Sequence, residues 1–298
     1  MLAKIERIGR KILGLRSEAV GFSYRDYQKE VDSHFDSTSS YWADIYHIRS
    51  VEGVIYQQRM AVVLEWIDDL TLPKGSRILE IGCGAGLTTI KLASSGYGVD
   101  AIDSSEAMVE RTLREVIESG AGDRVKVFRG DANSLPFEDD TFTLVLAIGV
   151  IPWLESPDTA MREMARVLKP GGYLILNSDN LMRLNYLLDP RYYPVLAPLR
   201  RILKRTLERT GLRKPRIDLV HMHTTSYIDR VCSRNRLEIE RAFTLGFGPF
   251  SFLGRTLLPQ SLGVSLNYRL QALADRGVAG LRSTGSQYVV LGRKRRTF

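Results

Sequence analysis

Three glycines and two carboxylates near residue 80 have the types and spacing of a ligand-binding site. The segment Leu79-Glu80-Ile81-Gly82-Cys83-Gly84-Ala85-Gly86 closes a short apolar run, and the next apolar run ends at Asp103. Glycines after a strand let backbone N–H groups approach a ligand without obstruction by a Cβ atom. A carboxylate at the tip of the following strand can accept hydrogen bonds from both hydroxyls of a ribose. These residues therefore predict a site for a nucleoside-containing cofactor.

Alternating strands and helices would position these residues. The pattern predicts helices at 87–95 and 158–167, and strands at 77–81, 125–129, 143–148 and 173–177. Such alternation favours parallel strands joined by right-handed crossovers. Leu87 stands where a dinucleotide-binding loop would have its third glycine, so the spacing disfavours an oxidoreductase.

The order of the further motifs indicates a family. Gly130-Asp131-Ala132 follows the third strand, and Leu135-Pro136-Phe137 with an acidic turn precedes the fourth. Leu168-Lys169-Pro170-Gly171-Gly172 then leads into the fifth strand. This ordered set resembles the class I S-adenosylmethionine-dependent methyltransferases. Within them it resembles the methyltransferase type 11 branch, typified by the ubiquinone and menaquinone biosynthesis enzymes, over residues 77–178.

The resemblance implies an α/β fold: a doubly wound, mostly parallel seven-stranded Rossmann-like sheet with helices on both faces. It also implies S-adenosyl-L-methionine as the cofactor and S-adenosyl-L-homocysteine as the product. Around this core we expect an N-terminal helical arm or cap and a helical lid insertion. The expected regions are the arm (1–70), the cofactor-binding half of the core (71–180), the basic amphipathic lid (181–224) and the completion of the sheet (225–298).

The methionine and ribose parts of the cofactor are assigned by the resemblance to particular residues. The loop Gly82-Cys83-Gly84-Ala85-Gly86 would approach the methionine portion, and Glu80 would orient that loop. Asp103 would hold the ribose hydroxyls. Arg59, in the helix expected before the first strand, would bind the cofactor's carboxylate, because a guanidinium suits a carboxylate bidentately. Its alternative is an exposed helix arginine.

Six further residues would surround the adenine and the transferred methyl group. Those expected at the adenine are Ser104, Met108, Asp131 and Ala132, and those expected beside the methyl group are Ile148 and Gly149. Met108 and Ile148 have an alternative role as core residues.

Catalysis of methyl transfer depends mainly on placing a nucleophile against an activated methyl group. A general base is needed only if the nucleophile loses a proton. Trp153 stands near the position where many relatives carry a histidine, and the chain has no Asn/Asp-Pro-Pro-Tyr element. His221 and His223, at the end of the lid insertion, are therefore the candidate catalytic bases. An ordinary hydrogen-bonded or surface histidine is the alternative for each.

The net charge of +8 comes from the C-terminal part of the chain, where basic residues outnumber acidic ones about three to one after residue 180. Residues 2–16 and 192–216 each combine apolar residues at helical spacing with a basic face. Three interpretations remain open for such helices. They can pack on the core, dock on an anionic membrane surface or bind nucleic acid through phosphate attraction.

Compartment and metal content follow from what the sequence lacks. No apolar run approaches the roughly 18 residues of a membrane span, and no signal-like start is evident. Cys83 and Cys232 have no Cys or His at metal-ligand spacing. We therefore expect no disulfide, no metal site and a cytoplasmic location, with peripheral membrane contact as an option.

The function expected is methyl transfer to a small or lipid-linked acceptor, at oxygen first and carbon second. An apolar acceptor is favoured by the leucine-rich lid and by aromatic residues of the arm. Among these, Phe35-Asp36, Trp42 and Tyr46 resemble the magnesium-protoporphyrin methyltransferases. Two alternatives stay open: an RNA methyltransferase that uses the basic C-terminal part, and a non-catalytic module that binds the cofactor.

Overall fold

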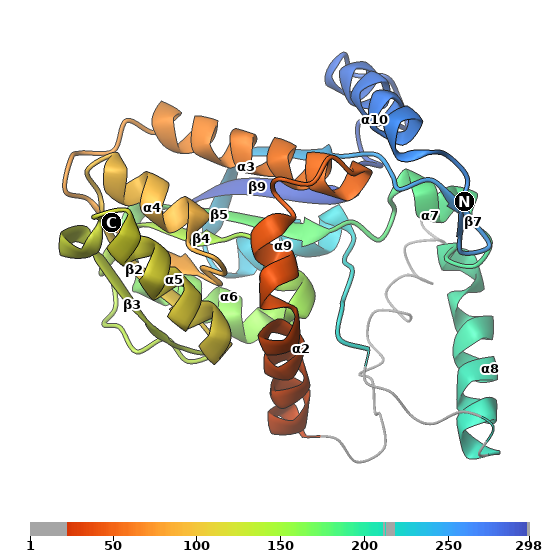
Figure 1. Ribbon diagram of the computed structural model, residues 1–298, viewed down its shortest axis with the longest axis horizontal. Helices are drawn as coiled ribbons and strands as arrows, with labels where there is room; N and C mark the ends of the chain where they lie inside the picture. The colour runs from red at the N-terminus through yellow and green to blue at the C-terminus, as the bar shows by residue number, and fades with distance from the viewer. Residues whose placement is uncertain (1–22, 211, 213–217, 297–298) are drawn as a thin grey trace.

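The computed structural model describes residues 23–210, 212 and 218–296, and Figure 1 shows their arrangement. A seven-stranded sheet in the order β3-β2-β1-β4-β5-β9-β6 lies at the centre. Its strands are β1 (Arg77–Ile81), β2 (Gly98–Asp103), β3 (Val125–Arg129), β4 (Phe142–Ala147), β5 (Leu168–Asp179), β6 (Leu237–Leu245) and β9 (Gln287–Lys294). β1 to β5 pair in parallel, whereas β9 lies antiparallel between β5 and β6. The expected doubly wound, mostly parallel sheet is confirmed.

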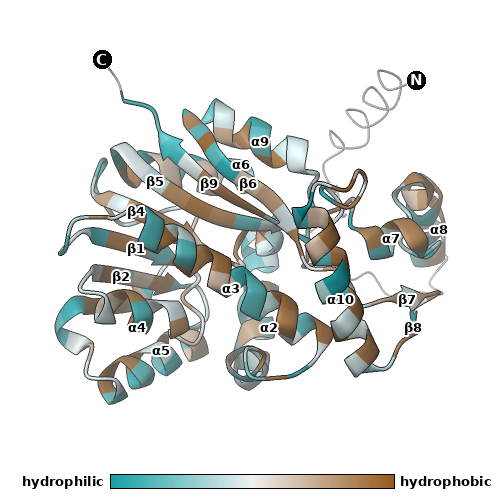
Figure 2. Cartoon of the chain, turned by 90° about the horizontal axis from the view of Figure 1, so that it is seen from above, coloured by the Kyte–Doolittle hydropathy of each residue, from teal (hydrophilic) through white to brown (hydrophobic). Residues whose placement is uncertain are grey.

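Helices cover both faces of this sheet because successive strand side chains point to opposite faces. Leu144 and Leu146 pack in one cluster with α3 (Val51–Asp69), α4 (Leu87–Ser94) and α5 (Glu106–Glu118). Val145 and Ala147 pack in the other with α6 (Pro157–Val167) and α9 (Thr225–Arg234). The strands at the centre of the sheet are the most apolar, and β5 and β9 are mostly brown in Figure 2. The sheet therefore has a hydrophobic layer on each side.

Two helices form the described part of the N-terminal arm. α2 (Tyr24–Asp44) begins with a capping box in which Ser23 and Asp26 bond each other's backbone. Asp36 of α2 accepts a hydrogen bond of 2.6 Å from Ser105 Oγ, at the start of α5. This contact holds α2 against the carboxyl end of β2. The basic segment at residues 2–16 lies outside the described residues.

The remaining elements follow β5 and interrupt the C-terminal half. They are α7 (Leu184–Leu188), α8 (Ala197–Arg209), the hairpin β7 (Ser251–Phe252) and β8 (Arg255–Thr256), α10 (Gln260–Asp275), and the short 3-10 turns η1 (Gly122–Arg124), η2 (Ile151–Trp153) and η3 (Pro194–Leu196). α8 stands apart from the sheet in Figure 1. Its residues Leu199 and Leu203 are 64% and 58% exposed, so this stripe does not pack on the core as the first interpretation would require. None of the described helices is both long and apolar enough to span a bilayer.

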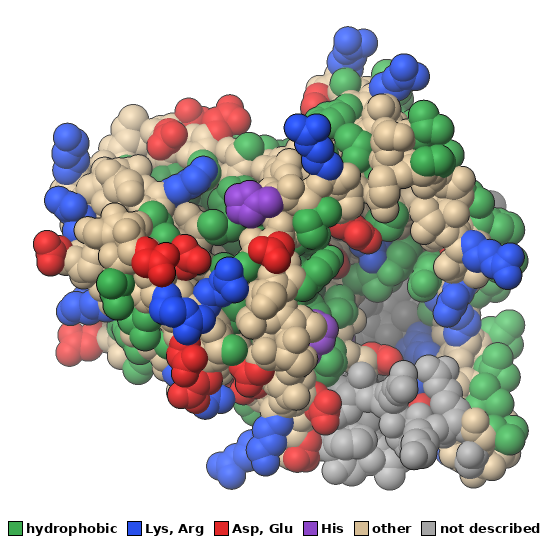
Figure 3. Space-filling model, viewed as in Figure 1, with side chains coloured by type: hydrophobic (Ala, Val, Ile, Leu, Met, Phe, Trp, Pro, Cys, Tyr) green, Lys and Arg blue, Asp and Glu red, His purple; other side chains and the backbone are tan. Residues whose placement is uncertain are grey.

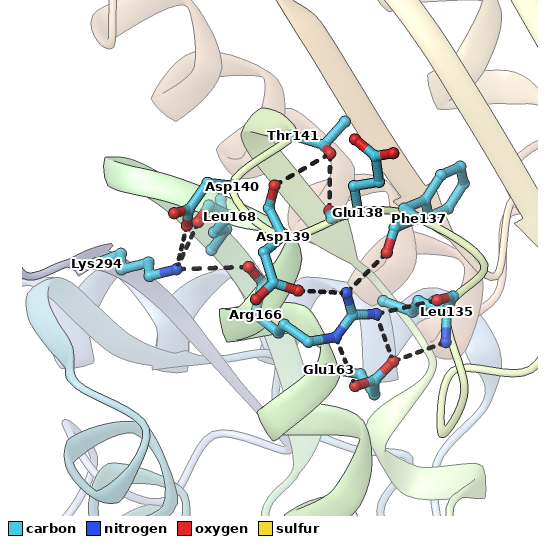
Figure 4. A network of polar contacts seen from close by, with 10 residues as sticks. All are labelled: Leu135, Phe137, Glu138, Asp139, Asp140, Thr141, Glu163, Arg166, Leu168 and Lys294. Carbon is cyan, nitrogen blue, oxygen red and sulfur yellow. Dashed lines mark hydrogen bonds and ion pairs between the residues drawn. The ribbon is translucent and has the colours of Figure 1, made fainter.

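Ion pairs fix the acidic turn before β4, as Figure 4 shows. Arg166 of α6 pairs with Asp139 and with Glu163, each at 2.8 Å, and donates to the carbonyl of Phe137 at 2.7 Å. Lys294 of β9 pairs with Asp140 at 2.7 Å. The turn is therefore held by cations of two other elements, α6 and β9.

Candidate active site

The carboxyl ends of the parallel strands border a cavity of about 280 Å³. In open α/β sheets, ligands bind in the crevice outside these ends. Residues from β1, β2, β4 and β5 or the loops after them line it, together with residues of α2 and α3. The N-terminal helices therefore complete a site that the sheet begins.

The loop after β1 presents bare backbone to this cavity. Gly82, Gly84 and Gly86 have φ of +70°, +56° and +78°, which side-chain-bearing residues rarely adopt. A Cβ at Gly84 would meet no other heavy atom of the described residues within 4 Å, so a side chain there would project into cavity space. At Gly82 a Cβ would stand 2.6 Å from Cγ2 of Val150. Glycine is thus required at both positions, for different reasons.

Asp103, the last residue of β2, faces the cavity beside this loop. Its Oδ2 accepts from the N–H of Gly84 and its Oδ1 from the N–H of Ser105, both at 3.0 Å. Burial raises the pKa of this carboxyl to about 6, while the backbone hydrogen bonds oppose the rise. At neutral pH the site therefore contains a carboxylate that is fixed in place and poorly hydrated.

Glu80 contributes a second carboxyl at the same end of the cavity. It is 5% exposed, and its Oε2 accepts a hydrogen bond from the hydroxyl of Thr89 in α4. Burial raises the pKa of Glu80 to about 7, against the hydrogen bonds from Thr89 and Thr88, which lower it. Glu80 therefore ties the first strand to the first turns of α4 and changes charge near neutral pH.

Arg59 of α3 also lines the cavity and is only 5% exposed. Its Nη1 donates to Gln287 Oε1 at 3.1 Å and its Nη2 to the hydroxyl of Tyr46 at 2.8 Å. Its Nε is buried and has no hydrogen-bond partner among the described residues. The alternative of an exposed helix arginine is therefore wrong. A buried cation with a free donor is suited to an anionic ligand group.

A chain of amides continues from Arg59 across the strand ends. Asn177 of β5 accepts from the N–H of Gly149 at 2.6 Å and donates to Gln287 Oε1 at 2.6 Å. Gln287 in turn donates to Asp179 Oδ1 at 2.9 Å. Asp179 lines the cavity, and burial raises its pKa, although the charges of Arg183 and Arg59 oppose the rise. These groups form a continuous polar patch beside Gly149.

Aromatic side chains form another part of the cavity wall. The ring of Phe35 lies 4.7 Å from that of Trp153 and 5.6 Å from that of Trp42. Trp42 in turn lies 6.0 Å from Tyr56. These rings come from α2, α3 and η2, and they all line the cavity with Tyr46. The wall is suited to a flat or apolar ligand group.

Polar contacts surround Asp131, another residue that lines the cavity. Its Oδ2 accepts from the hydroxyl of Tyr24 at 2.8 Å, and its Oδ1 from the N–H of Asn133 at 2.8 Å. The other residues expected near the adenine also line the cavity: Ser104, Met108 and Ala132. Met108 is 1% exposed and therefore belongs to the core as well as to the wall.

Comparison with known proteins gives this geometry a family. Residues 79–176 match the family described as "Methyltransferase domain". The chain is 30% identical over 155 residues to a sterol 4-C-methyltransferase of Caenorhabditis elegans, a match that covers 49% of the chain and 46% of that protein. It is 38% identical over 102 residues to the demethylmenaquinone methyltransferase of Clavibacter sepedonicus, covering 34% of the chain and 40% of that protein. The chain thus spans less than two thirds of the length of either relative.

The fold has a solved counterpart. The crystal structure of magnesium protoporphyrin IX methyltransferase from Synechocystis PCC 6803, with bound S-adenosylhomocysteine, has a TM-score of 0.59 to the chain at 19% identity. The match covers 90% of the chain and 99% of the chain in that crystal structure. Residues 79–176 are a methyltransferase domain, and the fold around them is that of the class I S-adenosylmethionine-dependent enzymes. The cofactor of such domains is S-adenosyl-L-methionine.

The residues present in the cavity fit that cofactor. Asp103 offers ribose hydroxyls a fixed acceptor, and Gly84 leaves room at the loop where a Cβ would otherwise project. The unpartnered Nε of Arg59 is a donor available to a carboxylate. Glu80 and Asp103 place negative charge where a cationic sulfonium and ammonium would be held. Among the described residues, no group of three His, Cys, Asp or Glu side chains could bind a metal ion.

Most of the expected cofactor residues come together. The cavity is lined by Arg59, Glu80, Gly82, Cys83, Gly84, Ala85, Asp103, Ser104, Met108, Asp131, Ala132, Ile148 and Gly149. Gly86 does not line it and instead begins α4, where a Cβ would stand 3.1 Å from Cγ2 of Thr112. Gly86 therefore allows α4 and α5 to approach.

The two candidate catalytic histidines lie outside the set of residues lining the cavity, although their neighbour Val220 belongs to it. His221 packs against Tyr27 at 5.7 Å, and His223 stacks on Tyr227 at 4.9 Å. Burial lowers the pKa of both rings, that of His223 to about 4, with the charge of His221 lowering the latter further. The backbone N–H of His223 donates to the carbonyl of Asp179, at the end of β5, at 3.0 Å. Neither histidine lines the cavity, however, and their catalytic role stays a prediction.

Sequence reasoning missed the polar patch formed by Asn177, Asp179 and Gln287. A signal for it existed, because Asn177 was expected to end a strand and polar residues at such an end face the ligand crevice. Gln287 carried no such signal. It reaches the patch because β9 pairs antiparallel with β5, in a register that puts Gln287 opposite Asp179.

Proposed function

We propose that this chain transfers a methyl group from S-adenosyl-L-methionine to a small or lipid-linked acceptor that binds against the aromatic wall. The observation that carries the proposal is a single cavity whose wall has a polar part and an aromatic part. Asp103 and the glycine loop belong to the polar part, and Phe35, Trp42 and Trp153 contribute rings to the aromatic part. The acceptor would then bind against the aromatic part of the wall, next to the cofactor.

Two relatives support an apolar acceptor. One carries the name of a sterol methyltransferase and the other that of a demethylmenaquinone methyltransferase. Both names describe lipid-type acceptors of those proteins. The aromatic wall of this chain has the chemistry to bind such a group, because flat rings bury large apolar area with little loss of conformational freedom.

The chain's own residues would act by positioning and by exclusion of water. When bound, the cofactor supplies an already activated methyl group. Arg59, Gln287 and Asn177 form a hydrogen-bonded chain that fixes the polar patch beside Gly149. The aromatic rings exclude water from the acceptor side. Holding an acceptor in a near-attack position can supply much of the rate enhancement of a displacement of this kind.

Oxygen is the acceptor atom that we favour, because Asp179 is a carboxylate among the residues that line the cavity. Its Oδ1 is held by Gln287 at 2.9 Å. Burial raises its pKa, which makes the carboxylate a better base than an exposed one. A hydroxyl acceptor that binds beside Asp179 could transfer its proton there as the methyl group arrives. An acidic carbon next to a hydroxyl is the second choice.

The experiment that tests the function follows a labelled methyl group. The purified chain is incubated with S-adenosylmethionine labelled at the methyl carbon and with an extract of its source cells, and the products are separated into organic and aqueous phases. We expect label in the organic phase, and much less of it with the D103N variant at a limiting cofactor concentration. Label confined to water-soluble metabolites contradicts the lipid-linked acceptor, and no transfer to any fraction contradicts the function itself.

A further inference from the structure

An exposed apolar stripe runs along α8, away from the cavity. Leu199, Ile202 and Leu203 are 64%, 63% and 58% exposed, and their spacing puts them on one face of the helix. Just before α8, Val195 is 71% exposed. Soluble proteins seldom leave such a row of large aliphatic side chains uncovered, and contiguous patches of this kind mark interaction sites.

The β7–β8 hairpin extends this apolar surface. Leu188 at the end of α7 and Leu253 at the hairpin tip are each 60% exposed. Asp189 binds the two segments together, since its Oδ1 accepts from the N–H of Leu253 at 3.1 Å. The same residue accepts from Tyr192 and Tyr193 through its carbonyl, both at 2.9 Å, in the turn that leads to α8. Figures 1 and 2 both place α7, the hairpin and the start of α8 side by side.

Basic residues accompany the stripe. Between residues 181 and 209 the chain has seven Lys or Arg and only two Asp or Glu. On α8, Arg200 and Arg209 flank the apolar face on its two sides, by the 100° turn per residue. Arg200 is held there by bonds of 2.9 Å and 3.3 Å to the carbonyls of Tyr193 and Tyr192. Figure 3 shows hydrophobic and basic side chains next to one another along this side of the molecule.

We propose that α8 and the β7–β8 hairpin form a docking surface for an anionic phospholipid bilayer, with α8 lying in the plane of the interface. Charge complementarity selects this partner. A helix with aliphatic residues on one face and arginines at its margins can bury the first among acyl chains while the second reach phosphate groups. Nucleic acid would engage the arginines but leave the leucine stripe exposed. The docking does not depend on the methyl-transfer proposal.

The test is sedimentation of the full chain with vesicles, with no acceptor present. One set of vesicles is phosphatidylcholine alone, and the other mixes phosphatidylcholine and phosphatidylglycerol at about two to one, which gives a negative surface potential. We expect binding to the anionic vesicles only, weakened by salt. The L199Q/L203Q variant should have an affinity for the anionic vesicles that is lower by roughly tenfold or more. In the R200Q/R209Q variant this affinity should fall roughly fivefold for each arginine removed.

Matched controls come from α5, whose exposed face lies elsewhere. Ile117 is 74% exposed, and Arg114 is exposed on the same helix. I117Q and R114Q therefore remove an exposed aliphatic group and an exposed cation without changing the proposed surface. Both should bind vesicles as the unchanged chain does. Thermal unfolding of all four variants checks that they remain folded.

Three results would overturn the proposal. The first is an absence of binding to anionic vesicles, or equal binding to vesicles of phosphatidylcholine alone. The second is a vesicle affinity of L199Q/L203Q that equals that of I117Q, with a single-stranded RNA oligonucleotide bound through Arg200 and Arg209 instead. The third is a chain that is dimeric in solution and becomes monomeric in L199Q/L203Q, which would make the stripe a contact between copies. If the unchanged chain binds anionic vesicles but transfers no methyl group, the proposed function is contradicted and the docking proposal is not.

Discussion

Replacement of Asp103 by asparagine should weaken the binding of S-adenosylhomocysteine by roughly 10- to 100-fold, because hydrogen bonds to a charged group contribute about 1.5 to 3 kcal/mol each. The carboxylate already accepts from the N–H of Gly84 and of Ser105, both at 3.0 Å. An amide has only one acceptor oxygen. In D103N the side-chain NH₂ group must therefore face one of these N–H groups, which loses its acceptor. The substitution also removes the negative charge to which the ribose hydroxyls would donate.

The pH dependence of affinity gives a second readout of the same residue. Burial raises the pKa of Asp103 to about 6 in the free protein. If the ionised form binds the cofactor, affinity is constant above that pH and falls by about tenfold per pH unit well below it. The amide in D103N does not titrate in this range, so the affinity of this variant should not fall with the protonation of residue 103.

Isothermal titration calorimetry with S-adenosylhomocysteine measures both effects, since the product binds without turnover. D100N is the matched control, because Asp100 lies on the same strand, is 4% exposed and pairs with Arg77 at 2.6 Å. It is not among the residues that line the cavity. D100N should lose stability but keep its affinity. Equal affinity in D103N and the unchanged chain, with a folded variant, would refute the reasoning.

Three further results are expected. The contribution of Glu80 to stability should fall as pH rises from about 4 to about 7, because burial raises its pKa to about 7 in the folded state, from about 4.3 in an unfolded chain. E80Q should remove this contribution from the pH dependence of the melting temperature, and a pH dependence equal to that of the unchanged chain contradicts it. G82A should lower the free energy of unfolding by roughly 1 to 3 kcal/mol through the clash with Val150. G84A should chiefly lower the affinity for S-adenosylhomocysteine, measured by calorimetry. A larger loss of stability in G84A and a larger loss of affinity in G82A would be inconsistent with the loop geometry. D179N should slow methyl transfer to a hydroxyl acceptor by roughly 10²- to 10⁴-fold, measured in single-turnover assays with labelled cofactor. Its affinity for S-adenosylhomocysteine should not change. A rate within twofold of that of the unchanged chain would exclude Asp179 as the base.

The cofactor half of the sheet was predictable because its signals are local. Strand β1 (Arg77–Ile81) and strand β3 (Val125–Arg129) have the limits expected from the sequence. Each is a short strand followed at once by a glycine, and the glycine motif indicates which end of the strand faces the ligand. β5 was expected at 173–177 but extends over Leu168–Asp179, because the Lys-Pro-Gly-Gly segment continues the strand.

The acceptor side was less predictable because its residues meet through tertiary packing. Trp153 and Phe35 are 118 positions apart in the sequence, yet their rings lie 4.7 Å apart. The position of α2 across the strand ends brings them together, and no spacing in the sequence specifies that position. The same limit explains the histidines: the lid ends near the cavity, but His221 and His223 turn toward Tyr27 and Tyr227.

The amphipathic pattern of α8 was recognised, but not the direction of its apolar face. A stripe such as Leu199 and Leu203 usually packs on a core, and periodicity alone cannot distinguish a core face from an exposed docking face. Here α8 stands apart from the sheet, and the stripe is exposed.

A crystal structure of the chain with S-adenosylhomocysteine tests the central claim most directly. We expect the ribose hydroxyls within hydrogen-bond distance of the Asp103 carboxylate and the homocysteine portion against Gly82 and Gly84. The thioether sulfur should face the cavity space lined by Trp42 and Tyr56. A ligand whose ribose lies away from Asp103, or whose sulfur points away from the aromatic wall, would contradict the account.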